Sequence, residues 1–214
     1  MTDESYLGID IGTNSIRVLE KDSQGKILKW GILERRGRVF HSSIRPMLPE
    51  DVASALSDLL ATMAVRSREA VMSVAPFYVF TVVGNTIDPG SIPARPGAYK
   101  LQGAYLKDGR YFFTAIPRDI ELAYQQIAES AGLRLLRLEP TSFALAGQFH
   151  DRRGKVLVVD EDQRCTTYIE ISNGRVDYVF HSDFGSDSGA ADVIMNKAKE
   201  IAATRGINQL VFSI

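Results

Sequence analysis

Residues suited to binding an anion lie near the N-terminus, where an apolar run ends in Asp-Ile-Gly-Thr-Asn-Ser at residues 10–15. Gly12 and Asn14 tolerate the left-handed backbone angles that a tight turn needs. Around such a turn, backbone N–H groups and the hydroxyls of Thr13 and Ser15 can face an anion, as in a phosphate cradle. Asp10, at the end of the apolar run, could hold a hydrated Mg²⁺ beside the phosphates. The alternative is an ordinary hairpin with an Asx turn.

Strands on both sides must position this turn. Residues 6–11 form an apolar run and residues 16–19 alternate between apolar and polar types, which predicts a strand, a tight turn and a second strand. Residues 27–33 predict a third strand. Pro49, followed by two acidic residues, predicts the start of an amphipathic helix, and residues 70–75 predict a buried strand.

The last third of the chain repeats this order of elements. Residues 156–160 and 166–171 predict two strands, and Asn173-Gly174 predicts a type I′ turn into a third strand at residues 176–180. A helix and a short closing strand follow. A meander of three strands, then a helix and a strand, therefore occurs twice, which indicates an internal repeat.

The segment between the two repeats reads as a mixture of strands and helices. A stretch rich in proline and glycine at residues 88–97 predicts a surface loop. The order of strand, helix and strand from residue 111 to residue 138 predicts an inserted α/β subdomain. The predicted strands are residues 78–83, 111–116 and 133–138, and the predicted helices are residues 118–131 and 141–149.

The composition argues against several classes of function. Of 214 residues, 45% are apolar and 24% charged, and a net charge of −1 gives no electrostatic case for nucleic acid or an anionic membrane. No apolar stretch approaches the roughly 20 residues of a spanning helix, and the acidic first residues are unlike a signal peptide. One cysteine and three scattered histidines give neither a disulfide nor zinc-ligand spacing. We therefore expect a cytoplasmic protein without a metal cage of its own.

These motifs stand in the order found in actin-like ATPases. The segment at residues 10–15 resembles the first phosphate-binding motif of that superfamily, especially in the pilus assembly protein PilM and its relative FtsA. Leu-Glu-Pro-Thr-Ser-Phe-Ala-Leu-Ala at residues 138–146 resembles the segment that links the two halves of these proteins. Residues 156–171 take the place of the second phosphate-binding hairpin, and residues 113–140 look most like PilM.

The resemblance implies an α/β, actin-like (ribonuclease H-like) duplicated fold with an inserted α/β subdomain and a truncated second half. It implies a first subdomain at residues 1–69 completed by a helix at 141–150, a PilM/FtsA-like insertion at 70–140, and a second subdomain at 151–214 that lacks its own insertion. It also implies a cleft for ATP and Mg²⁺, with Asp10 and Asp160 as metal ligands. The residues implied to hold the nucleotide are Asp10, Gly12, Thr13, Asn14, Ser15, Glu139, Asp160 and Thr166.

The sequence departs from the family pattern on the nucleotide side. Asp162 stands where the second phosphate loop has a glycine, and its carboxylate would repel a polyphosphate unless a metal bridged it to Asp160. Arg164 could compensate as a phosphate ligand or could be an exposed turn residue. Glu139 resembles the cleft acid of the family, or else an acid stabilised by the N-terminus of the next helix. The sequence reaches Ile214 before the family's adenosine-binding Gly-Gly turn, so we expect ATP and Mg²⁺ to bind weakly or not at all, without hydrolysis.

The resemblance implies a cytoplasmic scaffold of a type IV pilus or a related secretion machine. Its implied partner is the N-terminal tail of a PilN-like inner-membrane protein, bound as an extended peptide, so that contact with the membrane is indirect. The alternatives are an active actin-like ATPase or small-molecule kinase, and an FtsA-like cell-division protein. The candidate apolar residues of the peptide groove, each of which could instead belong to the core, are Val71, Val74, Phe77, Tyr78 and Phe80.

Overall fold

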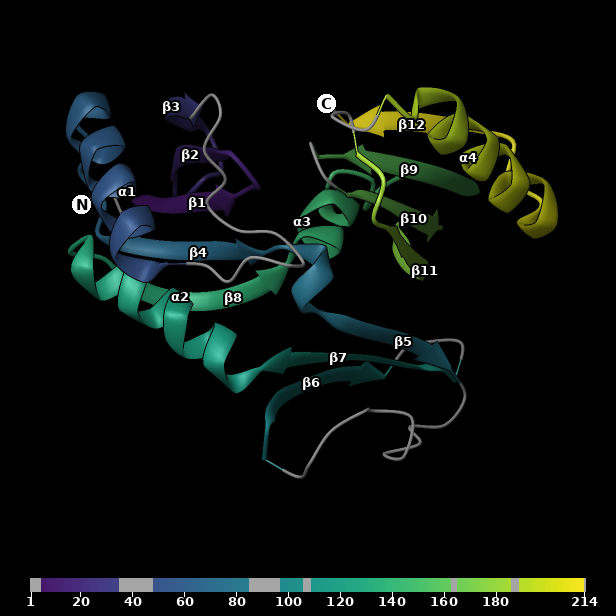
Figure 1. Cartoon of the computed structure of the whole chain (residues 1–214), viewed down its shortest axis with the longest axis horizontal. Coiled ribbons are helices and arrows are strands. Elements are labelled where there is room, and N and C mark those ends of the chain that lie inside the picture. Colours follow the sequence, from purple (N-terminus) through teal and green to yellow (C-terminus); the bar gives the residue numbers. More distant parts are fainter. Residues whose placement is uncertain are drawn as a thin grey trace. The chain divides into compact units, whose positions relative to one another are not determined.

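The architecture is α/β with three separate sheets, as the sequence predicts (Figure 1). The structure is a computed structural model and describes residues 5–34, 48–84, 97–105, 109–162, 165–185 and 189–213. The chain divides into two compact units. The first unit comprises residues 1–75 and 118–140, and the second comprises residues 76–117 and 141–214.

A five-stranded sheet in the order β3-β2-β1-β4-β8 is the centre of the first unit. β1 to β3 form an antiparallel meander, and β4 and β8 extend the sheet in parallel with β1. Alternation along β1 places Leu7, Ile9 and Ile11 in the core. The predicted strand, turn and strand at the N-terminus are therefore confirmed. The strands of this sheet are β1 (Ser5–Ile11), β2 (Ser15–Asp22), β3 (Ile27–Glu34), β4 (Glu69–Val74) and β8 (Arg134–Pro140).

Two helices, α1 (Pro49–Met63) and α2 (Arg118–Ser130), pack against this sheet and against each other. α1 begins with a proline and carries two acidic residues in its first turn, which favour the positive end of the helix dipole. It ends at Ala64, which has a left-handed φ of 48° and donates its N–H to carbonyl groups of the last turn. The buried face of α1 consists of Val52, Ala53, Ala55, Leu56, Leu59 and Leu60.

The second unit repeats this plan in a four-stranded sheet with the order β11-β10-β9-β12. β9 to β11 form an antiparallel meander, and β12 runs parallel to β9. Asn173 and Gly174 both have positive φ angles, of 50° and 75°, as the predicted type I′ turn requires. The elements of this repeat are β9 (Lys155–Glu161), β10 (Thr166–Ser172), β11 (Arg175–Ser182), α4 (Ala191–Arg205) and β12 (Leu210–Ser213).

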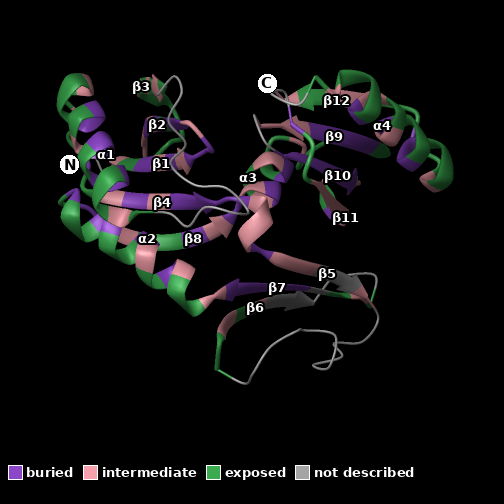
Figure 2. Ribbon diagram, in the orientation of Figure 1, coloured by how far each residue is buried: buried purple, intermediate pink, exposed green. Residues whose placement is uncertain are grey.

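Both faces of the second sheet are buried, as the purple colour of β9 and β10 in Figure 2 shows. Leu157 and Val159 of β9 pack with Tyr168 and with the buried face of α4. Their neighbours in the strand, Val156 and Val158, point to the other face and pack beside α3 (Thr141–Gly147). The sheet therefore lies between one helix on each side.

The two repeats correspond residue by residue at their first hairpin. The turn of the first repeat is closed by a hydrogen bond of 2.8 Å from the N–H of Gly12 to the carbonyl of Ser15. In the second repeat, Asp162 donates in the same way to Cys165, at 2.9 Å. The predicted internal repeat is confirmed, and Asp162 occupies the place that Gly12 has in the first repeat.

A third sheet, in the order β5-β7-β6, belongs to the second unit. The sequence predicts β7 but not β6, whose strand pattern is interrupted by polar and glycine residues. β5 starts at residue 80 rather than 78, because Pro76–Tyr78 form a short 3₁₀ turn. Residues 88–96 of the predicted surface loop lie outside the described residues. The strands are β5 (Phe80–Gly84), β6 (Tyr99–Tyr105) and β7 (Tyr111–Pro117).

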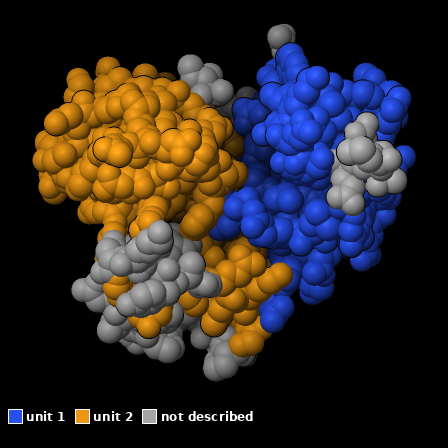
Figure 3. Space-filling model, turned by 180° about the vertical axis from the view of Figure 1, so that it is seen from behind, with its two compact units in different colours: residues 1–75, 118–140 blue, residues 76–117, 141–214 orange. Residues whose placement is uncertain are grey.

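Sheet membership differs from the predicted division of the chain. β4, α2 and β8 belong to the first unit and not to an insertion at residues 70–140, because β4 pairs in parallel with β1 and β8 pairs in parallel with β4 (Figure 3). Of the three sheets in the described residues, the sheet of β5, β6 and β7 is the one that contains no strand of either repeat. α3, which was expected to complete the first subdomain, instead packs on β10 and β11 of the second unit.

Candidate functional site

Asp10, the residue best placed to hold a metal in the sequence, has partners on both neighbouring strands. It lies opposite Arg17 of β2 and Ser73 of β4 in the sheet. The Ser73 hydroxyl donates a hydrogen bond to Oδ1 of Asp10, and Nη1 of Arg17 lies 3.1 Å from Oδ2. Each carboxylate oxygen therefore has a donor. A metal ion at this carboxylate would share its oxygens with these two donors and would have to tolerate the positive charge of Arg17.

Glu139 continues the same row of side chains at the far edge of the sheet. It lies opposite Ser73 in the parallel pairing of β4 and β8, so that Asp10, Ser73 and Glu139 share one face. Two strand spacings separate Asp10 from Glu139, or roughly 10 Å. Glu139 forms an ion pair of 3.0 Å with Arg137 of its own strand. The structure therefore brings together two of the predicted acids, each already paired with an arginine.

The residues of the predicted phosphate-binding turn are more buried than the sequence suggests. Gly12, Thr13 and Ser15 are buried, and Asn14 is half-buried. Neither Gly12 nor Asn14 has a positive φ angle, so the prediction of left-handed backbone angles at these two residues is wrong. The hydrogen bond between Gly12 and Ser15 closes the hairpin without them. The Thr13 and Ser15 hydroxyls, expected to face an anion, are not exposed.

Asp160 in the second unit has the position that Asp10 has in the first. It lies opposite Thr167 of β10 and Ser213 of β12, as Asp10 lies opposite Arg17 and Ser73. The predicted ligand Thr166 is fully buried, and its hydroxyl donates a hydrogen bond of 2.6 Å to the carbonyl of Phe184. The Thr166 hydroxyl therefore has a structural role, as a donor to the main chain after β11. The sequence analysis missed Thr167, which the register of the first hairpin could have identified.

Acidic groups among the described residues act on the thiol of this second turn. Burial, followed by the charges of Asp162, Asp160 and Asp183, raises the pKa of the Cys165 thiol to about 12. Burial lowers the pKa of His181 to about 4, although Asp183 acts in the opposite direction. Three carboxylates around one turn repel a polyphosphate. Within the described residues, no group of three or more histidine, cysteine or acidic side chains could hold a metal ion.

The predicted groove residues fall into different environments. Val74 is fully buried, so it is core and cannot line a peptide groove. Val71 is half-buried on the first unit's sheet. Phe77, Tyr78 and Phe80 are half-buried in the second unit, and the rings of Phe77 and Tyr78 meet edge to face at 4.6 Å. Four of the five residues thus retain exposed surface.

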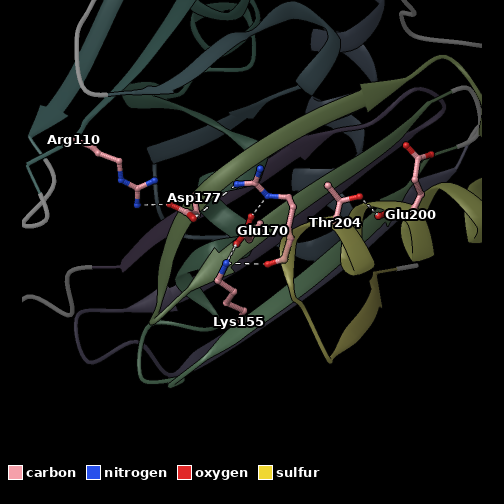
Figure 4. Close-up of polar contacts among 7 residues, drawn as sticks. Arg110, Lys155, Glu170, Asp177, Glu200 and Thr204 are labelled. Carbon is pink, nitrogen blue, oxygen red and sulfur yellow. Dashed lines mark hydrogen bonds and ion pairs between the residues drawn. The ribbon is translucent and has the colours of Figure 1, made fainter.

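A network of charges around buried Glu170, which the sequence did not predict, lies within the second unit (Figure 4). Glu170 of β10 is fully buried, with Lys155 Nζ 3.0 Å from its Oε1 and Nε of Arg205 paired with its Oε2. Arg205 lies over the ring of Tyr178, 4.4 Å from its centroid. Asp177 pairs with Arg110, which precedes β7. This network connects the end of α4 with both sheets of the unit.

No protein-family model matches the chain, and no curated protein matches it. Solved structures do match. A chain of a PilM–PilN type IV pilus biogenesis complex has a TM-score of 0.67 at 14% identity, over 94% of this chain and 70% of the other. The cytoplasmic domain of EpsL, an inner membrane component of the Vibrio cholerae type II secretion system, has a TM-score of 0.58 at 12% identity, over 89% and 74%.

The fold is named in the description of a third matched structure. A Bacteroides thetaiotaomicron protein of unknown function, described as having an actin-like ATPase fold, has a TM-score of 0.55 at 7% identity, over 99% of this chain and 91% of its own. For some other matched structures the chain spans less than two thirds of their length. The chain therefore has the actin-like fold, as predicted, with its two repeated sheets and no large insertion in the second repeat.

Proposed function

We propose that this protein is a scaffold of a type IV pilus or type II secretion-like machine. The observation that carries the proposal is the fold match to the PilM–PilN complex, which extends over 94% of the chain. The match to the EpsL cytoplasmic domain supports the same class of machine, since EpsL is described as part of a secretion system. In this role the protein works by binding other components rather than by turning over a substrate.

The proposed partner is the N-terminal tail of a PilN-like inner-membrane protein. The name of the matched complex supports this choice. Half-buried Phe77, Tyr78 and Phe80 supply apolar surface next to a strand, which suits an extended peptide that adds main-chain hydrogen bonds. None of the described helices is long and apolar enough to cross a membrane. In this proposal the protein acts in the cytoplasm and reaches the membrane through this partner.

A nucleotide has a minor role or none in this proposal. Mg²⁺ would need Asp10, whose carboxylate already accepts from Ser73 and pairs with Arg17. Phosphates would need the second turn, where Asp162 stands in the place of Gly12 and two more acids lie close. We infer from these contacts that a magnesium nucleotide is disfavoured. An active ATPase or kinase is therefore the weaker candidate.

Isothermal titration calorimetry with a synthetic tail of the PilN-like protein from the same genome tests the proposed partner. We expect micromolar affinity, because a short tail buries few side chains and loses conformational entropy on binding. Phe77→Ala and Tyr78→Ala should weaken it. Leu122→Ala is the matched control, since Leu122 is an exposed apolar residue of the first unit. Absence of heat with a folded protein would reject the proposed partner.

A further inference from the structure

The edge strand β3 exposes an unusual amount of apolar surface. Ile27, Leu28, Trp30 and Ile32 are 55%, 46%, 70% and 49% exposed, and Figure 2 shows the strand largely in green. β3 is the end strand of its sheet, so its outer edge is paired with no other strand of the described residues. Proteins usually protect such edges with charged residues or proline. The one lysine near the centre of β3, Lys29, is turned toward the end of α1 and does not cover the open face.

The two faces of β3 have different environments. A side chain at Gly31 would collide with Met63 of α1, and Lys29 donates to the carbonyl of Ala64 at the end of that helix. Lys29 and Gly31 therefore face α1, which leaves Trp30 and Ile32 on the opposite, open face. The pairing of β2 and β3 shifts by one residue near Ile27, which is why Ile27 and Leu28 are both exposed.

The corresponding strand of the second repeat is covered. β11 occupies the same end of its sheet as β3 does. Within the second unit, α3 and β5 pack against β11, and most of its residues are half-buried. Of the described elements, α1 and β2 make the main contacts with β3, and both leave its open face exposed. In the second repeat, α3 and β5 cover the end strand of the sheet. Among the described residues, β3 has no corresponding helix or strand on its open face.

The sequence of β3 is complementary to itself when read in the opposite direction. Around Trp30, Leu28 mirrors Ile32 and Ile27 mirrors Leu33. At the outer ends, Lys26 mirrors Glu34, which carries the opposite charge, and both side chains are exposed. In an antiparallel pair of two β3 strands centred on Trp30, every outward apolar residue therefore meets an apolar residue. Each lysine meets a glutamate.

We propose that β3 is a self-association edge, at which a second copy of this chain pairs its own β3 antiparallel across a two-fold axis at Trp30. Such a contact is isologous, because the same surface is used by both copies. It would join two five-stranded sheets into one continuous sheet and remove both free edges. The two tryptophan rings, with Leu28 and Ile32, form its apolar centre, and two Lys26–Glu34 pairs close its ends.

Trp30 is the only tryptophan in the sequence, so all tryptophan fluorescence comes from the centre of the proposed contact. The experiment is a dilution of the full chain from about 100 µM to about 1 µM, a range that brackets a micromolar dimer. Emission is recorded together with sedimentation velocity. We expect a dimer at the high concentration, with Trp30 emission at shorter wavelength, and a monomer with red-shifted emission on dilution.

Exchange of the end charges tests the register. Glu34→Lys places lysine opposite lysine at both ends, and Lys26→Glu places acid opposite acid, so each should raise the dimer dissociation constant about 10-fold. The double variant Lys26→Glu/Glu34→Lys restores opposite charges and should regain the original value. Both positions are exposed, so all three variants should keep the fold, and circular dichroism checks this.

Replacement of the centre tests the surface itself. Trp30→Lys should abolish the dimer, as followed by sedimentation. The matched control Leu122→Lys, at an exposed apolar residue of α2, should leave the dimer intact. A chain that remains monomeric at about 100 µM would overturn the proposal. So would a dimer that is indifferent to Trp30→Lys or to the charge exchange. An emission shift that appears only when a tail peptide or lipid vesicles are added would also overturn it.

Discussion

Glu20 and Glu170 occupy the same position in the two repeats, and both side chains are buried. Glu20 of β2 lies opposite Leu7 of β1, and Glu170 of β10 lies opposite Leu157 of β9. Glu20 accepts hydrogen bonds of 2.9 Å from the backbone N–H groups of Arg66 and Ser67, in the segment between α1 and β4. Glu170 instead pairs with Lys155 and Arg205.

These two glutamates fix the same connection by different chemistry. In each repeat, the chain leaves the helix and re-enters the sheet as the next parallel strand, β4 after α1 and β12 after α4. In the first repeat Glu20 binds the backbone of Arg66 and Ser67, just after α1. In the second, Glu170 binds the side chain of Arg205, the last residue of α4. A buried carboxylate therefore holds the end of the helix in both repeats.

Removal of either carboxylate should destabilise the fold. We expect Glu170→Ala to lower the free energy of unfolding by about 3 kcal/mol, because it leaves Lys155 and Arg205 without their buried partner. Glu20→Ala should cost about 2 kcal/mol, because two backbone N–H groups lose their acceptor. Urea denaturation followed by circular dichroism measures both. The control Glu200→Ala, at an exposed pair with Lys197 on α4, should change stability by less than about 1 kcal/mol.

ATP hydrolysis should be absent or negligible, because Asp10 is engaged by Arg17 and Ser73 and Asp162 replaces a glycine. Release of phosphate from ATP in the presence of Mg²⁺ measures this. Arg17→Met, which frees one oxygen of Asp10, should not restore turnover because the second turn stays acidic. Turnover near about 1 per second, the lower end of ordinary enzymes, that disappeared in Asp10→Ala would contradict the account.

Cys165 should be an inert thiol in the folded protein. Its pKa is raised from 9.0 to about 12, first by burial and then by the three neighbouring acids, so the reactive thiolate is scarce at pH 8. Alkylation by iodoacetamide should therefore be roughly 1,000-fold slower in the folded chain than in urea. The unfolded chain releases this proton at lower pH, so the thiol's contribution to stability is lost as the pH rises from 9 toward 12. Fast alkylation of the folded chain would refute the burial.

His181 should make the protein sensitive to acid. Burial lowers its pKa from 6.5 to about 4, so the folded state favours the neutral ring. This contribution to stability is present above pH 6.5 and is lost as the pH falls toward 4, with a size of at most about 3 kcal/mol. The free energy of unfolding should fall more between pH 7 and pH 4.5 in the wild type than in His181→Gln, which has no ring to protonate. His150→Gln, at an exposed histidine, should behave as the wild type.

Local patterns in the sequence were sufficient to predict the elements of both repeats. Alternation predicts β1 and β2, Pro49 marks the start of α1, and Asn173-Gly174 predicts the hairpin of β10 and β11, since each of these signals acts over a few residues. The division of the chain could not be predicted in the same way. It depends on the parallel pairing of β4 with β8, whose partner residues are separated by more than sixty positions.

The partners of the candidate site residues required the register of the sheet. The sequence identified Asp10 and Glu139, but Arg17 becomes visible as the partner of Asp10 only when β1 is aligned with β2. Arg137, the partner of Glu139, lies two residues away in the same strand. The pair of Glu170 with Arg205 depends on where α4 ends relative to β10, a tertiary relationship without a local signal. Asp10 and Asp160 belong to different units, so their joint role as metal ligands stays a prediction.

Hydrogen–deuterium exchange with and without the PilN-like tail peptide tests the proposed scaffold role most directly. At a peptide concentration of about 1 mM, far above a micromolar dissociation constant, binding should be complete. The account predicts slower exchange in the segment of Phe77, Tyr78 and Phe80, because an extended peptide would cover it and bond to its backbone. Exchange that is unchanged by the peptide along the whole chain of the folded protein would contradict the account.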